Sequence, residues 1–62
     1  MSQIVIYKGV SVLPQERSQG KIRVRTTNPA DAQKAGLPFA EMDGATAVFE
    51  AWVPEQELVA VD

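Results

Sequence analysis

The chain has 62 residues, 45% of them hydrophobic, and a net charge of −2, which fits one small folded domain spanning residues 1–62 and argues against disorder. It contains no Cys and no His, so disulfides are excluded and the commonest metal ligand and general base is missing. We therefore expect no enzyme activity, no metal and no cofactor. Because so short a chain is marginally stable alone, we also expect a homo-oligomer.

The N-terminal part of the chain predicts two extended stretches separated by a kink, followed by a loop. Residues 1–7 lack the basic start and long apolar core of a signal peptide, and no apolar run is as long as a membrane span, so we expect a cytoplasmic protein without membrane contact. The β-branched and aromatic residues 3–7 favour a strand. Lys8-Gly9 predicts a kink before a second extended stretch at residues 10–13. The polar residues 14–20, bounded by Pro and Gly, predict a loop.

The next segment has the clearest alternation of the chain. In residues 21–27, the pattern points Ile22 and Val24 inward. The outward positions form a basic stripe, which we define as Lys21, Arg23 and Arg25.

A short helix is predicted over residues 29–35. Asn28 is a good N-cap, Pro29 suits the first helical position, and Asp31 lies in the first turn, where a negative charge is favourable. Gly36 can adopt the left-handed conformation that ends a helix. A helix of two turns is unstable alone, so it must pack on the sheet.

Asp43-Gly44 predicts a tight hairpin turn. The strand beginning at Ala45 should then pair with residues 38–42, which precede the turn. Because an unpaired buried carboxylate is costly, the alternate set that contains Glu50 should face outward. Phe49 and Val53 then belong to the core. The outward set is Thr46, Val48, Glu50 and Trp52.

The chain is expected to end with a single 3₁₀ turn at residues 54–57 and a last strand at residues 58–62. The segment Trp52-Val-Pro-Glu-Gln-Glu-Leu58-Val-Ala-Val resembles the end of SH3-like barrels, which often have an apolar residue, a Pro, one 3₁₀ turn and an apolar strand. Tyr7-Lys-Gly-Val-Ser-Val12 is similar to their opening. The resemblance implies a mainly β, small SH3-like barrel of four to five strands, with the short helix inserted in the region 26–44, where the resemblance fails.

The charges are divided unevenly along the chain. Residues 1–34 hold all six basic and two acidic groups, a net charge of +4, whereas residues 35–62 hold six acidic groups and no basic group, a net charge of −6. The favoured interpretation is that the two parts complement each other across neighbouring strands of one molecule. The alternative is a bipolar surface for self-association or for a charged partner.

The function predicted from these patterns is that of a small protein-interaction module, which binds and modulates a larger protein and self-associates. An exposed Trp52 would mark the contact site, because large aromatic residues dominate binding energies at interfaces. The predicted protein-binding residues are Trp52, Val48, Glu50 and Pro54. The open alternative is that residues 14–20 or the helix cover Trp52.

Two other functions are less favoured. A nucleic-acid-binding barrel would use Lys21, Arg23 and Arg25 on phosphates, but the chain is acidic, with an isoelectric point near 4.9, and no aromatic residue interleaves with these side chains. An oligomeric enzyme with a central pore is the weaker possibility. Type II dihydrofolate reductases, which resemble SH3-like barrels of similar size, build their active site in this way.

Overall fold

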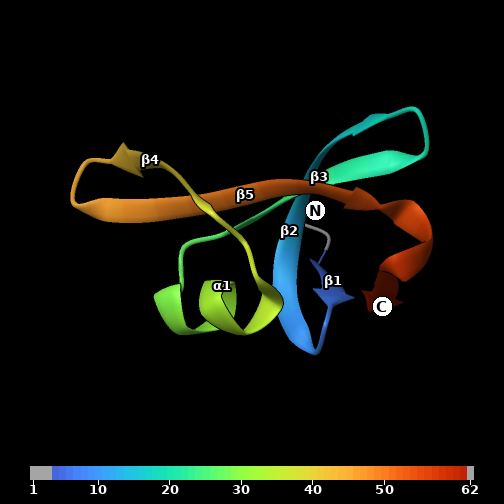
Figure 1. Ribbon diagram of the computed structural model, residues 1–62, viewed down its shortest axis with the longest axis horizontal. Helices are drawn as coiled ribbons and strands as arrows, with labels where there is room; N and C mark the ends of the chain where they lie inside the picture. The colour runs from blue at the N-terminus through green and yellow to red at the C-terminus, as the bar shows by residue number, and fades with distance from the viewer. Residues whose placement is uncertain (1–3, 62) are drawn as a thin grey trace.

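The computed structural model describes residues 4–61, which form one antiparallel sheet with a short helix packed on one face (Figure 1). The elements are β1 (Ile4–Tyr7), β2 (Val10–Ser18), β3 (Lys21–Thr26), α1 (Pro29–Ala35), β4 (Phe39–Asp43), β5 (Thr46–Pro54), the 3₁₀ helix η1 (Glu55–Glu57) and β6 (Val59–Val61). The mainly β fold with one short helix is confirmed. The sheet has six strands, more than the predicted four to five, in the order β4-β5-β3-β2-β1-β6, and it is not closed.

Two tight turns set the register of the first three strands. The turn residues Lys8 and Gly9 join β1 to β2, and Gln19 and Gly20 join β2 to β3; all four have positive φ angles, between 52° and 84°. Two-residue turns of this kind match the twist of the flanking strands. The predicted kink at residues 8–9 is therefore a hairpin turn.

The polar loop predicted at residues 14–20 is wrong, because β2 continues through Ser18. A Pro is tolerated inside this strand for two reasons. The register of β2 against β3 shifts by one residue between Pro14 and Arg17, which marks a β-bulge, and β1 pairs only with residues 10–12 of β2. Beyond that pairing one side of β2 is free, so no partner strand needs an N–H at Pro14.

The predicted helix is confirmed with its bounds and caps. The Asn28 side chain accepts hydrogen bonds from the backbone N–H groups of Ala30 (2.9 Å) and Asp31 (3.2 Å). At the other end Gly36 has a φ of 75°, and the Leu37 N–H donates to the carbonyl oxygen of Ala32 at 2.8 Å. These bonds satisfy backbone groups that a helix leaves unpaired at its ends. They also turn the chain so that Leu37 enters the core.

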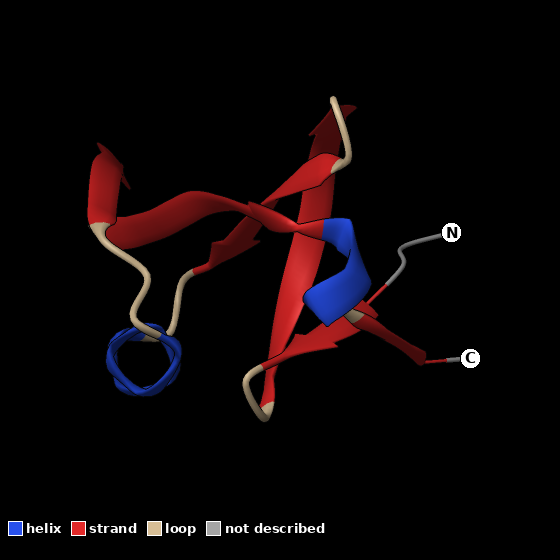
Figure 2. Cartoon of the chain, turned by 45° about the vertical axis from the view of Figure 1, so that its right-hand side comes forward, coloured by secondary structure: helices blue, strands red, loops and turns tan. Residues whose placement is uncertain are grey.

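The core lies between α1 and the inner face of the sheet, which is the face on the helix side (Figure 2). Its buried members are Tyr7, Val10, Val12, Val24, Ala32, Ala35, Leu37 and Val53. The two Ala residues form the buried stripe of α1 and allow the helix to approach β2, β3 and β5 closely. The strand that contains Ile22 and Val24 thus points these residues inward, as its alternation predicts.

The second half of the chain follows the predicted hairpin. β4 pairs with β5, and Gly44 has a positive φ of 64° in the turn between them. Val53 is buried in the core and Phe49 is half-buried against it, as predicted. η1 and β6 follow as expected, and β6 pairs with β1, so the first and last strands are neighbours. Residues 1–3 and 62 lie outside the described residues, and with them residue 3 of the predicted first strand and residue 62 of the predicted last strand.

Candidate protein-contact surface around Trp52

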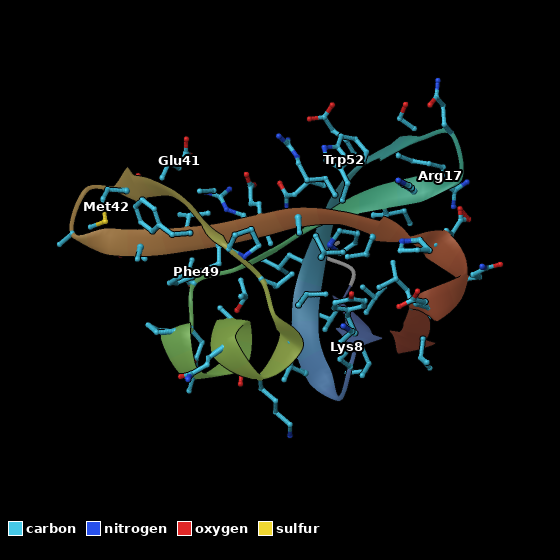
Figure 3. The ribbon with its side chains drawn as sticks, in the orientation of Figure 1. Lys8, Arg17, Glu41, Met42, Phe49 and Trp52 are labelled. Atoms are coloured by element: carbon cyan, nitrogen blue, oxygen red, sulfur yellow. The ribbon has the colours of Figure 1, made fainter. Side chains whose placement is uncertain are left out.

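Trp52 lies on the outer face of the sheet, opposite to α1, and 45% of its surface is exposed (Figure 3). It belongs to β5 and faces Arg23 of β3 directly across the pair. Because nearly half of Trp52 is exposed and α1 packs on the other face, the alternative in which residues 14–20 or the helix cover Trp52 completely is not realised. The largest side chain of the chain is accessible to a partner.

Charged side chains around Trp52 are joined in ion pairs. The bulge in β2 leaves Glu16 near Arg23, and the two side chains form an ion pair. On the other side, Arg25 lies 3.8 Å from a carboxylate oxygen of Glu50 (Nε to Oε2) and 4.0 Å from one of Glu41 (Nη2 to Oε2). The Arg25 and Glu50 side chains are only 28% and 18% exposed, so solvent screens this pair less than a surface pair.

These pairs show where the basic and acidic parts of the chain meet. Arg25 in the basic part reaches Glu41 and Glu50 in the acidic part, and Arg17 reaches Glu55 at 2.9 Å. A backbone hydrogen bond from the Glu55 N–H to the Gly20 carbonyl oxygen (3.0 Å) holds η1 against the turn between β2 and β3. The favoured interpretation of the charge division, pairing within one molecule, agrees with this geometry.

The basic stripe faces outward as predicted, but its two Arg side chains are largely occupied. Both are about two-thirds shielded from solvent, both are ion-paired, and the Nε atom of each is buried without a hydrogen-bond partner. Lys21 is exposed and has no ion pair among the described residues. A phosphate would have to displace the carboxylates before it could bind both Arg side chains.

Of the other predicted contact residues, Glu50 and Pro54 lie on the Trp52 face and Val48 does not reach the surface. Glu50 is held by Arg25, and Pro54 is half-buried opposite Lys21. Val48 has 0% exposed surface, so its prediction as an exposed contact residue is wrong. Its neighbours on this face are Glu41, directly across, and Glu50, two residues along, and both extend to Arg25. The stems of long charged side chains often cover apolar surface, and the register places Glu41 and Glu50 next to Val48, where their stems can do so.

The apolar part of this candidate surface is smaller than predicted, because Val48 is buried. We define the Trp52 surface as Trp52 and Pro54 together with the ion-paired Arg23, Glu16, Arg25 and Glu50. It consists of one exposed aromatic residue surrounded by charges that neutralise each other.

Sequence reasoning missed a second apolar surface, on the outer face of β2, β1 and β6. The register places Ile6 beside Val59, and Ser11 on the other side of Ile6. We define the aliphatic face as Ile4, Ile6, Leu13 and Val59; all but the half-buried Ile6 are exposed. The signal in the sequence was the alternation of Ile4 and Ile6 on the face opposite to Val5, but without the register it could not be joined to Leu13 and Val59.

No protein-family model matches this chain, and no curated protein or solved structure matches it significantly. Within residues 4–61, no three His, Cys, Asp or Glu side chains gather closely enough to hold a metal ion. Among the described helices, none has the length and apolar character needed to span a bilayer.

Proposed function

We propose that the protein is a small protein-interaction module that binds and modulates a larger protein through the Trp52 surface. The observation that carries this proposal is the exposure of Trp52 on a face where the neighbouring side chains are fixed by ion pairs. Trp is among the residue types most often found at the energetic centre of an interface.

The ion pairs also indicate the chemistry of the partner. Because Arg23, Arg25, Glu16 and Glu50 are already paired, a partner need not neutralise them, and little side-chain entropy is lost when they become an interface rim. The partner should therefore offer an apolar pocket for the indole ring, with polar groups around it. An isolated charged groove would be a poor match.

Trp52→Ala should remove partner binding and leave the fold intact, because the indole ring contributes to the outer face and not to the core. At an interface hot spot, this truncation typically costs about 2–4 kcal/mol, or roughly 30- to 1,000-fold in affinity. The measurement is affinity capture from an extract of the expressing cells, with immobilised wild type, Trp52→Ala and Gln33→Ala compared by mass spectrometry. Gln33 is exposed on α1 and serves as the control.

Partners retained by wild type and Gln33→Ala but lost from a folded Trp52→Ala would support the proposal. The same proteins on all three supports would exclude the Trp52 surface as the contact site. Loss of the circular dichroism signal in Trp52→Ala would show that Trp52 is a core residue, and the surface assignment would fail.

We further infer that the fold is a small SH3-like barrel with an insertion. Three features support this inference: β6 lies beside β1, η1 directly joins β5 to β6, and β2 pairs with both β1 and β3. α1 and β4 then form the insertion between β3 and β5. The inference concerns the fold alone, because such a fold hosts many functions.

Self-association is a second proposal, and it is favoured by the aliphatic face. None of its four members is charged, and one of them, Val59, belongs to β6, an edge strand of the sheet. Two copies that meet there would bury Ile4, Leu13 and Val59 without opposing like charges.

Sedimentation velocity over a concentration series is expected to reveal an association that persists in high salt, because the burial is apolar and the charges are paired within each chain. Val59→Lys should abolish the association, and Gln33→Lys, on exposed α1, should leave it unchanged. A monomer at every concentration would contradict the proposal, and an oligomer that dissociates in salt would show that the charged halves meet between subunits.

A further inference from the structure

β4 forms the other edge of the sheet, and its five residues are all exposed. It pairs with β5 on one side, and on its other side no strand lies among residues 4–61. Together with the first residues of β5 it projects from the body of the molecule, over α1 (Figure 1). An edge strand of this kind presents a row of unpaired backbone donors and acceptors, which can accept an added strand.

The two faces of β4 differ sharply in character. Phe39 pairs with Phe49 and Met42 with Ala47 on the inner face, where Phe39 and Met42 are both more than half exposed. The Phe39 ring is held against that of Phe49, edge to face, with the ring centroids 6.0 Å apart. Glu41 and Asp43 point to the outer face. β4 thus combines an apolar inner face, an acidic outer face and a free backbone edge.

The sheet already contains a strand that complements such an edge. β3 alternates Ile22 and Val24 on the inner face with basic residues on the outer face, and its Arg25 extends to both Glu50 of β5 and Glu41 of β4. Within the molecule, the acidic residues of β4 and β5 therefore lie beside a strand, β3, in which apolar and basic residues alternate. β3 itself is paired on both sides and cannot supply the free edge of β4.

We propose that the free edge of β4 binds an extended segment of another protein in which apolar residues alternate with Lys or Arg. The added strand would bond to the β4 backbone, lay its apolar side chains on Phe39 and Met42, and direct its basic side chains to Glu41 and Asp43. This site is separate from the Trp52 surface and does not depend on it.

Charge argues against a second copy of this chain as the occupant. Two β4 strands related by a two-fold axis would run antiparallel, with Glu41 and Asp43 of one copy beside those of the other. Like charges placed across a strand pair are destabilising. β6, the other edge strand of the sheet, is Val59–Val61 and carries no basic residue.

The test is an NMR titration of the ¹⁵N-labelled protein with a blocked hexapeptide, Lys-Val-Lys-Val-Lys-Val. We expect shift changes concentrated on the amides of residues 39–43. The peptide Lys-Lys-Lys-Val-Val-Val, which has the same composition without the alternation, should bind at least tenfold more weakly. Two further copies of the alternating peptide are N-methylated, one on its Lys amides and the other on its Val amides. The copy whose methylated amides would face β4 should also bind at least tenfold more weakly, because methylation removes those backbone donors.

Asp43→Lys should lower the affinity for the alternating peptide about tenfold, because it replaces an attraction across the strand pair with a repulsion. Met42→Ser should lower it several-fold, without a change of charge. The matched control is Glu57→Lys on exposed η1, which changes the net charge as Asp43→Lys does and should leave the affinity unchanged.

Equal weakening by Asp43→Lys and Glu57→Lys would reduce the binding to non-specific charge attraction and overturn the proposal. Absence of binding, or shift changes centred on Trp52 or β6, would also overturn it. So would equal affinity of the protein for the unmethylated peptide and both N-methylated peptides. Retention of peptide binding in Trp52→Ala is expected, so failure of this proposal leaves the proposed function untouched.

Discussion

Leu37→Ala is expected to lower the free energy of unfolding by about 2–5 kcal/mol, the range for truncation of a buried Leu. Leu37 is only 6% exposed and follows the Gly36 cap directly, so its side chain joins α1 to the core between the helix and the sheet. A domain of 62 residues has roughly 3–9 kcal/mol of stability in all, at about 0.05–0.15 kcal/mol per residue. Leu37→Ala should therefore remove a large share of the stability of the protein and lower its urea midpoint clearly.

Leu13→Ala provides the matched control for this prediction, because it removes the same atoms from a side chain that is 42% exposed on the outer face. It should change the free energy of unfolding by no more than about 0.5 kcal/mol. Urea denaturation of both variants, followed by circular dichroism at low protein concentration, gives the comparison. Equal losses in the two variants would mean that α1 is not docked on the sheet through Leu37.

Arg25→Glu is expected to lower the free energy of unfolding by about 2 kcal/mol. It removes two ion pairs, each worth up to about 1 kcal/mol, and places a third carboxylate beside Glu41 and Glu50, at a cost of similar size. The measurement is chemical denaturation at low and at high salt. The loss should shrink as salt screens the repulsion.

Two further variants isolate the pairing from the change in net charge. Lys21→Glu makes the same charge change on the same face of β3, and Lys21 itself forms no ion pair among the described residues, so this variant should cost less than about 0.5 kcal/mol. Adding Glu50→Lys to Arg25→Glu should restore about half of the lost stability, because it recreates an attraction across β3 and β5. If Lys21→Glu is as damaging as Arg25→Glu, the ion pairs contribute nothing specific.

The elements that the sequence predicts well are those specified by local chemistry. The helix at residues 29–35 depends on a capping side chain, a Pro and a Gly at fixed positions, and β3 depends on a strict alternation. β2 was mispredicted beyond Pro14 because polar residues in a twisted hairpin look like a loop. What allows the strand there is the bulge and the absence of a pairing partner on one side, neither of which has a local signal.

The site was predictable in part for the same reason. Alternation alone places Trp52 and Glu50 on the outer face. It fails for Val48, since burial on an outer face depends on the side chains of neighbouring strands, and Glu41, which lies directly across from Val48, belongs to β4. The aliphatic face and the β4 edge are likewise products of strand order, because each requires knowing which strands end the sheet.

Acrylamide quenching of Trp52 fluorescence at high dilution tests the central claim most directly. Trp52 is the only Trp in the chain, so the signal reports one side chain. We predict that folded protein keeps about half of the quenching seen in urea-unfolded protein, because 45% of the Trp52 surface is exposed on the outer face of β5. Strong protection in the folded state, independent of protein concentration, would place Trp52 in the interior and remove the proposed contact surface.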